Sequence, residues 1–432
     1  MMGPQLRALG AATVDAVRGR PRGQLLEEIH RAATDPAFAD DYTERGLRRL
    51  LAHARTTTSF YADIPEGAAL ADHPVLDKSD IREHTDRLLS RAFDRQELTT
   101  ASTSGSTGAP LYVHQDPGKR RRRAADALYY GLAAGYRTGM RLYYLKVWSG
   151  RNRRHPLVHR LRNVVPVDVM TMDDTAVARL LHRLRRERSS SAIVAYSSAL
   201  ELVARHLHAA DTPGTYRVAT VIAQSESLPD HAREIIAGHL GAPVYARYGN
   251  EEVGILGQQL DPGRPEYTLN RATAHVEILK LHADTPVDDG ELGRIVVTDL
   301  HNYAMPLIRY DTGDLGRFAL SPDGSPDRTR LARVEGRTAD QIFDTEDRPV
   351  SPHILVAFFW RYPGIHQAQL EQTDRGTYIL RLNALPDVAT DDIVTELRGV
   401  LGASAAVAVE RVDGIPVLRS GKRRPVVSSY RP

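Results

Sequence analysis

A cluster of hydroxyl and glycine residues gives the strongest local indication of chemistry in the sequence. The cluster consists of Thr103, Ser104, Gly105, Ser106, Thr107 and Gly108. Glycines let the backbone turn tightly and bring its N–H groups close to an anion, and the hydroxyls add further donors. Such a loop could hold phosphate groups, and a flexible surface linker is the alternative. No Gly-Lys-Ser/Thr ending follows, so a Walker A site is disfavoured.

Lysine is rare in this chain, so the position of each lysine is informative. Of 57 basic residues only five are lysines, which leaves 52 arginines. Lys422 follows Ser420 and Gly421 near the C-terminus, where composition alone predicts arginine. An ammonium group is a flexible point charge suited to neutralising two anions. The alternative for Lys422 is a solvated basic tail, because two arginines follow it.

The composition excludes several classes of protein. The 432 residues include no cysteine, which excludes disulfides, thiol catalysis and cysteine-ligated metal sites. A net charge of +3 is small for this length, so nucleic acid is not an expected partner. The N-terminal segment is too polar for a secretion signal, and no apolar run approaches the ~18 residues of a membrane span. We therefore expect a cytoplasmic protein with no membrane partner.

Periodic apolar patterns indicate the elements that position these residues. Helices are predicted near residues 25–32, 47–54, 80–89, 118–136, 175–188, 199–208 and 230–239. Strands are predicted at residues 111–113, 142–145, 193–196, 218–223, 244–247 and 295–297. Because strands alternate with helices, we expect an α/β fold with mixed, largely parallel sheets and flanking helices.

The C-terminal part of the chain has a different pattern. Residues 321–330 are predicted to be a turn-rich connection. Beyond about residue 340, helices are predicted near 351–361 and 390–401, and strands at 366–371, 377–383 and 405–411. These elements indicate a small α+β domain behind a large N-terminal one.

Six segments, in the same order, resemble those of adenylate-forming enzymes, the superfamily of acyl-CoA synthetases, peptide-synthetase adenylation domains and luciferases. More narrowly, the chain is similar to the phenylacetate–CoA ligase and capsule-biosynthesis ligase-like branch. The segments are residues 49–61, 74–82, 248–252, 305–314, 336–340 and 420–422. The hydroxyl and glycine cluster resembles the phosphate loop of the same enzymes.

The resemblance implies a division of the chain and a reaction. Residues 1–335 would bind ATP and the acyl substrate, and residues 336–432 would form a small mobile domain that carries the catalytic lysine. The reaction would activate a small-molecule carboxylic acid, an aromatic one being the leading candidate, with ATP and Mg²⁺. An acyl-adenylate and pyrophosphate would form, followed by transfer to CoA. Because dimers are common in similar proteins, a homodimer is one expected arrangement.

The resemblance also assigns roles to single residues. Glu252 matches the acidic Mg²⁺ ligand, and Lys422 matches the lysine that acts on the carboxylate and the α-phosphate. Asp314 matches the ribose ligand, because a carboxylate can accept hydrogen bonds from both ribose hydroxyls. The ordinary alternatives are a solvated loop carboxylate for Glu252 and a turn aspartate after Gly313 for Asp314.

Further assignments surround the nucleotide and the acyl group. The other residues expected to bind ATP are Ser225, Glu226, Tyr248, Gly249 and Arg337, with Asp340 as the hinge. The residues expected to line the acyl pocket are Tyr196, Ser197 and Trp148. Ordinary core packing is the alternative for the aromatic residues among them. Ser225 stands where similar enzymes carry glycine.

Some positions depart from the family pattern. Ala109 replaces a lysine that many relatives carry after the loop, and Glu251 replaces a threonine or serine before the acidic residue. A second carboxylate there could alter Mg²⁺ binding or suit an amine-bearing substrate. Residues 343–349 lack a glycine-rich turn often seen where pantetheine passes. The basic run 119–123 is predicted to be a solvated helix face, with contact to CoA phosphates as the alternative.

Two alternative functions stay open at this point. The first keeps adenylation but transfers the acyl group to an amine or another nucleophile in a biosynthetic pathway. The second is a regulatory nucleotide-binding protein without turnover. The presence of Lys422, Glu252 and Asp314 argues against the second, because a binding module needs no mobile lysine. Since the chain has no cysteine, the acyl group would pass to an external acceptor.

Overall fold

The computed structural model describes residues 22–103, 111–148, 155–209, 215–225, 227–337, 342–350, 362, 364–416 and 426–430. Its helices are α2 (Arg22–Thr34), α3 (Pro36–Thr57), η1 (Leu70–Asp72), α4 (Lys78–Glu83), α5 (Thr85–Leu88), η2 (Arg95–Glu97), α6 (Pro117–Ala133), α7 (Pro156–Leu161), η3 (Val169–Thr171), α8 (Asp174–Arg185), α9 (Ser197–Ala209), α10 (Asp230–Leu240) and α12 (Thr390–Leu401). Among these described helices, none is long and apolar enough to cross a membrane.

The strands fall into four sheets. They are β1 (Thr99–Thr103), β2 (Leu111–Gln115), β3 (Arg141–Lys146), β4 (Val164–Asp168), β5 (Ser191–Tyr196), β6 (Val218–Gln224), β7 (Val244–Asn250), β8 (Gly254–Gln258), β9 (Tyr267–Leu269), β10 (Ala274–Leu279), β11 (Gly293–Asp299), β12 (Tyr310–Leu320), β13 (Pro326–Arg337), β14 (Ile342–Phe343), β15 (Pro349–Val350), β16 (Ile365–Asp374), β17 (Thr377–Ala384), β18 (Ala406–Arg411) and β19 (Val426–Ser428).

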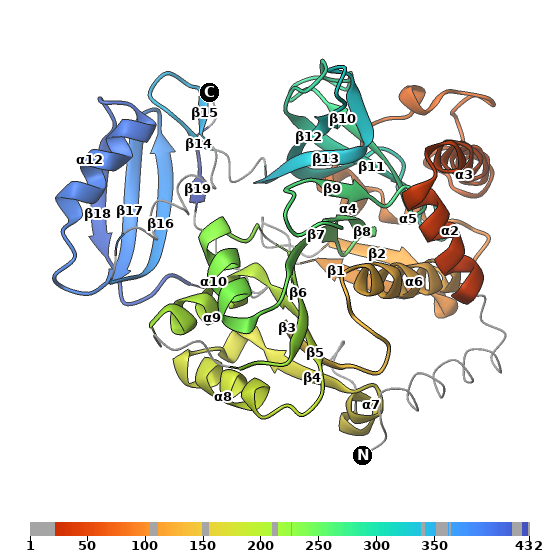
Figure 1. The fold of residues 1–432 in the computed structure, drawn as a ribbon. Helices are drawn as coiled ribbons and strands as arrows, with labels where there is room; N and C mark the ends of the chain where they lie inside the picture. Colours follow the sequence, from red (N-terminus) through yellow and green to blue (C-terminus); the bar gives the residue numbers. More distant parts are fainter. Residues whose placement is uncertain are drawn as a thin grey trace.

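The largest sheet is mixed and has eleven strands in the order β10-β11-β12-β13-β9-β8-β7-β6-β5-β3-β4. From β4 to β7 all neighbours are parallel, and α8, α9 and α10 gather around these strands (Figure 1). From β7 to β10 all neighbours are antiparallel. The expectation of a largely parallel sheet therefore holds only for the first half. Short connections such as 251–253 and 321–325 return the chain antiparallel, because a parallel crossover needs about a dozen residues.

Local sequence explains where several helices begin. Asp35 and Asp116 precede Pro36 and Pro117, and each aspartate accepts a hydrogen bond from a backbone N–H in the first turn. Proline is well suited to this position because its missing N–H would have no partner inside the helix. Asp173 caps α8 in the same way.

Two apolar cores hold the large sheet. The first lies between the parallel strands and helices α8, α9 and α10, which contribute Leu180, Val203 and Ile236. The second is enclosed by the antiparallel strands and contains the buried rings of Tyr248 and Tyr310. Packing in the second core therefore fixes two tyrosines that belong to segments with a predicted function.

The C-terminal strands form a separate sheet with the order β18-β17-β16-β19. Helix α12 packs on it, with Ile393 and Leu397 in one core with Leu370 and Leu380. This unit lies beside α9 and α10 (Figure 1), and the guanidinium of Arg205 on α9 donates to a carbonyl of β16 at 2.9 Å.

The structure confirms most of the predicted elements and corrects others. The helix predicted at 390–401 begins and ends at those residues as α12. Residues 326–330 are not a connection, because they open β13 and pair with the end of β12. Pairing with a neighbouring strand outweighs the local turn signals there. No strand was predicted at the positions of β1, β4, β8, β9, β10, β12, β13, β14, β15 and β19. The helix predicted near 351–361 lies outside the described residues.

Candidate functional site

Strands β1 and β2 border the hydroxyl and glycine cluster. They pair antiparallel, with Thr103 opposite Leu111. The residues between them therefore connect the two strands of a hairpin. Several predicted site residues lie outside the described residues and stay predictions: Ser104, Gly105, Ser106, Thr107, Gly108, Glu226, Asp340 and Lys422.

The structure brings Tyr248 and Asp314 together. The Tyr248 hydroxyl, on β7, donates a hydrogen bond to Oδ2 of Asp314, on β12, at 3.0 Å. Strands β8, β9 and β13 lie between β7 and β12 in the sheet order. In a flat sheet, spacings of ~4.8 Å would hold the two strands about 19 Å apart. The antiparallel half must therefore curl until these two strands face each other.

The protonation state of this pair is set by its surroundings. Burial, and then the Asp314 carboxylate, raise the pKa of Tyr248 well above its ordinary value. Tyr248 therefore stays a neutral donor. Asp314 keeps lone pairs that can accept further hydrogen bonds, as a ribose diol would require. Arg337 ends β13 with its backbone opposite Asp314.

Glu252 is buried, with 2% of its surface exposed. Its Oε1 accepts a hydrogen bond from the Tyr310 hydroxyl at 2.8 Å, and the Lys78 ammonium lies 3.8 Å from the same oxygen. Burial and the Glu252 carboxylate raise the pKa of Tyr310 well above its ordinary value, so this hydroxyl also stays a donor. The alternative of a solvated loop carboxylate is therefore wrong for Glu252.

A tight turn between β7 and β8 presents Glu252. A Cβ atom on Gly249 would overlap the carbonyl oxygen of Gly254, so only glycine fits there without a shift of the backbone. The Asn250 side chain accepts a hydrogen bond from the Val253 N–H at 2.7 Å and closes the turn. The geometry of the turn thus explains the glycine and the asparagine of this segment.

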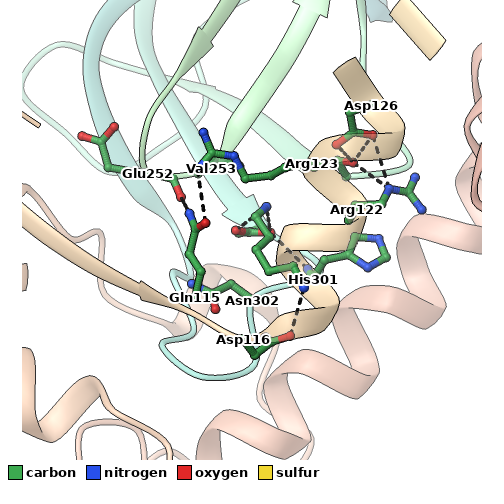
Figure 2. A network of polar contacts seen from close by, with 12 residues as sticks. Gln115, Asp116, Arg122, Arg123, Asp126, Glu252, Val253, His301 and Asn302 are labelled. Atoms are coloured by element: carbon green, nitrogen blue, oxygen red, sulfur yellow. Dashed lines mark hydrogen bonds and ion pairs between the residues drawn. The ribbon is translucent and has the colours of Figure 1, made fainter. Parts of the chain in front are cut away.

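Glu251, the unusual residue before Glu252, is paired with an arginine. Nη2 of Arg123 lies 3.0 Å from Oε2 of Glu251, whose side chain is 64% exposed. Nη1 of Arg123 donates to Gln115, and Gln115 in turn donates to the backbone carbonyl of Glu252 at 3.1 Å. Figure 2 shows the Gln115 side chain reaching toward Glu252, whose carboxylate points away from helix α6. The extra carboxylate is therefore engaged by Arg123.

The prediction of a solvated face for the basic run at the start of α6 is wrong for two of its residues. Lys119 and Arg122 have 0% and 1% of their surface exposed, whereas Arg120 and Arg121 are exposed. The charge run does not show which of its members are buried. Carboxylates compensate the two buried ones: Asp126 on the same helix, and Glu28 and Asp299 far away in the chain.

The two buried cations and their carboxylate partners form a network that we call the α6 charge cluster. It consists of Lys119, Arg122, Asp126, Asp299 and Glu28. The Lys119 ammonium lies 2.7 Å from Asp299, and both side chains are fully buried. Arg122 forms ion pairs with Asp126 at 3.4 Å and Glu28 at 3.1 Å. The cluster ties α2, α6 and β11 together, with Arg122 and Asp126 on one helix (Figure 2).

The predicted ATP contact Ser225 has an unusual backbone. Its φ angle is 77°, in the left-handed region that favours glycine. This conformation is the one in which glycine is favoured over a residue with a side chain. The preceding Gln224 ends β6 and donates from Nε2 to the Tyr144 hydroxyl at 3.3 Å.

The three predicted acyl-pocket residues lie near the carboxyl ends of the parallel strands. Tyr196 ends β5 and pairs with Gln224 in register. Ser197 begins α9 and is fully buried. Trp148 follows β3, and its Nε1 donates to the carbonyl of Tyr144 at 3.1 Å. The structure thus gathers them at the edge of the sheet where β7 leads to Tyr248.

The sequence did not indicate the roles of Tyr310, Lys78 and Arg123. Tyr310 and Lys78 lie inside segments that resemble the family, but their residue types alone assign no chemistry. The signal that could have singled out Lys78 is the rarity of lysine. Arg123 could not be separated from the 51 other arginines, because its partner Glu251 is far away in the sequence.

The acidic residues allow only a limited metal site. Within the described ranges, no group of three His, Asp or Glu side chains could hold a metal ion by itself. Mg²⁺ is commonly held by one or two carboxylates together with phosphate oxygens and water. Glu252, buried in the β7–β8 turn, could supply the one carboxylate that such a site takes from the protein.

A scan against protein-family models finds no match for this chain. Two curated proteins are similar over most of its length. The phenylacetate-coenzyme A ligase of Pseudomonas putida is 24% identical over 344 residues, covering 74% of this chain and 76% of the relative. The phenylacetate-coenzyme A ligase of Thermus thermophilus is 26% identical over 326 residues, covering 69% and 70%.

Solved structures show the same fold. A 2-hydroxyisobutyryl-CoA ligase in the postadenylation state, in complex with 2-HIB-AMP, matches with a TM-score of 0.70 and 18% identity. The match covers 91% of this chain and 90% of that one. The chain therefore has the fold of adenylate-forming ligases, and its sequence is similar to the phenylacetate–CoA ligases within that superfamily.

Proposed function

We propose that the protein activates a carboxylic acid with ATP to an acyl-adenylate and pyrophosphate, and then transfers the acyl group to CoA. The observation that carries this proposal is the joint placement of Tyr248–Asp314 and Tyr310–Glu252 where β7 and β12 meet. One pair offers a diol acceptor and the other a metal-binding carboxylate. The similarity to phenylacetate-coenzyme A ligases supports the substrate class.

The chemistry requires two anions to meet. A carboxylate oxygen attacks the α-phosphorus of ATP, a new P–O bond forms, and the bond to pyrophosphate breaks. Positioning and charge neutralisation supply most of the rate enhancement in phosphoryl chemistry of this kind. Asp314 would accept hydrogen bonds from the ribose hydroxyls, and residues 103–108 would hold the β- and γ-phosphates.

Glu252 would hold Mg²⁺, which neutralises phosphate charge when bound. The Tyr310 hydroxyl fixes the orientation of the carboxylate, because it donates to Oε1. The Lys78 ammonium lies 3.8 Å from that oxygen and is 23% exposed. Lys78 would therefore add a positive charge beside the carboxylate that is proposed to hold the metal.

Lys422 would complete the site from the C-terminal unit. The predicted boundary at residue 336 falls inside β13, so in this proposal the residues after Asp340 move as one body and bring the Lys422 ammonium to the α-phosphate and the substrate carboxylate. Lys422→Ala should lower the rate of adenylation by roughly 10²–10³-fold, because a charge that stabilises the transition state is lost. ATP binding, measured by calorimetry, should stay close to wild type. Full adenylation by the variant would remove Lys422 from the mechanism.

The acceptor is tested separately from the activation step. Pyrophosphate release is measured with a panel of carboxylic acids, with and without CoA, and the products are identified by mass spectrometry. We expect acid-dependent release and an acyl-CoA product. Release without thioester would favour an amine or another nucleophile as acceptor. ATP binding without release for every acid would favour the regulatory protein without turnover.

A further inference from the structure

Five side chains, one of them the acidic Asp168 beside Lys146, share one face at the carboxyl ends of the parallel strands. In register, Tyr196 pairs with Gln224, and Gln224 pairs with Arg247. On the same sheet face, Tyr144 pairs with Val194. Side chains two residues apart on a strand point to the same face. Lys146 lies two residues after Tyr144, and Tyr196 lies two residues after Val194. Lys146 therefore stands in the same row as Tyr196. Each side chain of this row is partly exposed.

Below this row the same face is apolar. Val194, Ile222 and Tyr245 are buried there and pack with Ala134 from the end of α6. The partly exposed polar row, which we call the rim, thus lies directly above a buried apolar layer, and polar groups set among apolar and aromatic side chains are the usual make-up of a site for a small organic ligand. The residues of the predicted acyl pocket, Tyr196 and Trp148, lie at this rim.

The rim side chains converge on Tyr144, and we call Lys146, Trp148, Gln224, Arg247 and Tyr144 the Tyr144 cluster. The Lys146 ammonium lies 4.9 Å from the centre of the Tyr144 ring and 4.7 Å from that of Trp148. The Trp148 ring meets the Tyr144 ring edge-on at 5.8 Å. Cation–π contacts hold an ammonium in place and leave its N–H groups free to donate.

Neither Lys146 nor Arg247, the two positive charges of the cluster, forms an ion pair in the described part of the chain. Asp168 pairs in register with Lys146 from the neighbouring strand β4, but its Oδ1 accepts a hydrogen bond from the backbone N–H of Met170. Arg247 donates from Nε to Gln258 at 2.8 Å, but its Nη2 is buried without a hydrogen-bond partner. Burial lowers the pKa of Arg247 to about 10, in keeping with a desolvated guanidinium that no carboxylate stabilises. A buried guanidinium N–H group without a partner, such as that at Nη2 of Arg247, is costly, and an anionic ligand would remove that cost.

We propose that the acid activated by this protein carries a second anionic group, such as another carboxylate, which the Tyr144 cluster binds through Lys146 and Arg247. This proposal rests on the proposed function and names its substrate class. The partly exposed aromatic rings of Tyr144 and Trp148 would pack against the carbon skeleton of the acid, and they suit a flat one. Charge-assisted hydrogen bonds from the two cations would select diacids over monoacids.

The test compares acids of nearly equal shape that differ in one charge. Terephthalate is set against 4-methylbenzoate, and 4-carboxyphenylacetate against 4-methylphenylacetate. The wild-type protein should show kcat/KM values at least about 10-fold higher for the diacid in at least one pair, as charge-assisted hydrogen bonds predict. Equal or higher values for both monoacids would overturn the proposal.

Variants then assign the preference to the cluster. Lys146→Met and Arg247→Met should each lower the ratio of diacid to monoacid by about 10–100-fold, since each removes one charge-assisted interaction. Lys280→Met is the matched control, because Lys280 is exposed at the end of β10, outside the site. An unchanged ratio in both cluster variants would contradict the proposal.

A binding measurement separates this proposal from the proposed function. Calorimetry without ATP measures the affinity of each acid for wild type and for Lys146→Met. If no acid supports pyrophosphate release, the proposed function fails, but tighter binding of the diacid, lost in Lys146→Met, still supports the cluster as an anion site. If pyrophosphate is released and diacids bind no better than monoacids, only the second anionic group is excluded.

Discussion

Two regions of the protein pair a lysine with an arginine, fully buried in one and partly exposed in the other, and the two differ in what faces the positive charge. In the α6 charge cluster, Lys119 and Arg122 each have a carboxylate at ion-pair distance. In the Tyr144 cluster, Lys146 and Arg247 face aromatic rings and an amide oxygen, with no such carboxylate in the described ranges. Both regions contain lysine and arginine on a helix or strand near the same sheet.

The difference separates a structural role from a binding role. A buried ion pair that is complete within the protein has no charge left for a ligand, and removing one partner leaves the other uncompensated. A cationic site without an internal anion keeps its charge for a ligand. The residue type alone therefore does not tell whether a lysine or arginine is structural or binds a ligand. The presence of a carboxylate at ion-pair distance distinguishes the two roles.

The largest expected effect on stability is at the α6 charge cluster. Lys119→Met should destabilise the protein by about 3–5 kcal/mol, because the Asp299 carboxylate would stay buried without its partner. The measurement is the shift of the chemical denaturation midpoint. The double variant Lys119→Met/Asp299→Leu should recover most of the loss. A single variant that unfolds at the wild-type midpoint would show that the pair is not needed.

A smaller effect is expected where the site meets a ligand. Asp314→Ala should raise the KM for ATP by about 10–100-fold, because the acceptor for the ribose hydroxyls is lost. Asp323→Ala, in the exposed turn between β12 and β13, is the control and should leave the KM unchanged. If Asp314→Ala binds ATP as tightly as wild type, the ribose contact lies elsewhere.

Ser225 tests whether strain is stored beside the Tyr144 cluster. Its left-handed φ of 77° costs a non-glycine residue roughly 1 kcal/mol. Ser225→Gly should therefore raise the free energy of unfolding by up to about 1 kcal/mol, measured by denaturation. Ser225→Val, whose branched side chain resists this conformation, should lower it. The reverse order of the two variants would exclude backbone strain at this residue.

The smallest expected effect on stability is at Lys146, which is compared with Lys119. Lys146→Met should change the free energy of unfolding by less than about 1 kcal/mol, because no carboxylate loses its partner and the methionine can still pack on the aromatic rings. Destabilisation comparable to that of Lys119→Met would mean that Lys146 is a structural residue, and the contrast between the two regions would fail.

The sequence predicted the α/β alternation, the longer described helices and the parallel strands β3, β5, β6 and β7, because apolar periodicity and caps are local, but it missed most strands of the antiparallel half. It also singled out Tyr248, Asp314 and Glu252, and the structure places them at neighbouring points of one curled sheet. It could not predict that Tyr310 would orient Glu252, or that Lys119 would be buried in an ion pair with Asp299. Both contacts join residues far apart in the chain. The charge run 119–123 was wrongly predicted to be solvated at Lys119 and Arg122 for the same reason, because the partners Asp299 and Glu28 lie far away in the chain.

The most direct test of the account is acid-dependent exchange of labelled pyrophosphate into ATP, measured for wild type and Glu252→Gln. Glutamine can still accept from the Tyr310 hydroxyl, so the variant removes the charge and keeps the shape. We predict exchange by wild type in the presence of Mg²⁺ and its substrate acid, and a loss of roughly 10²-fold or more in a folded Glu252→Gln variant. Exchange at the wild-type rate by Glu252→Gln, or no exchange by wild type with any acid, would contradict the account.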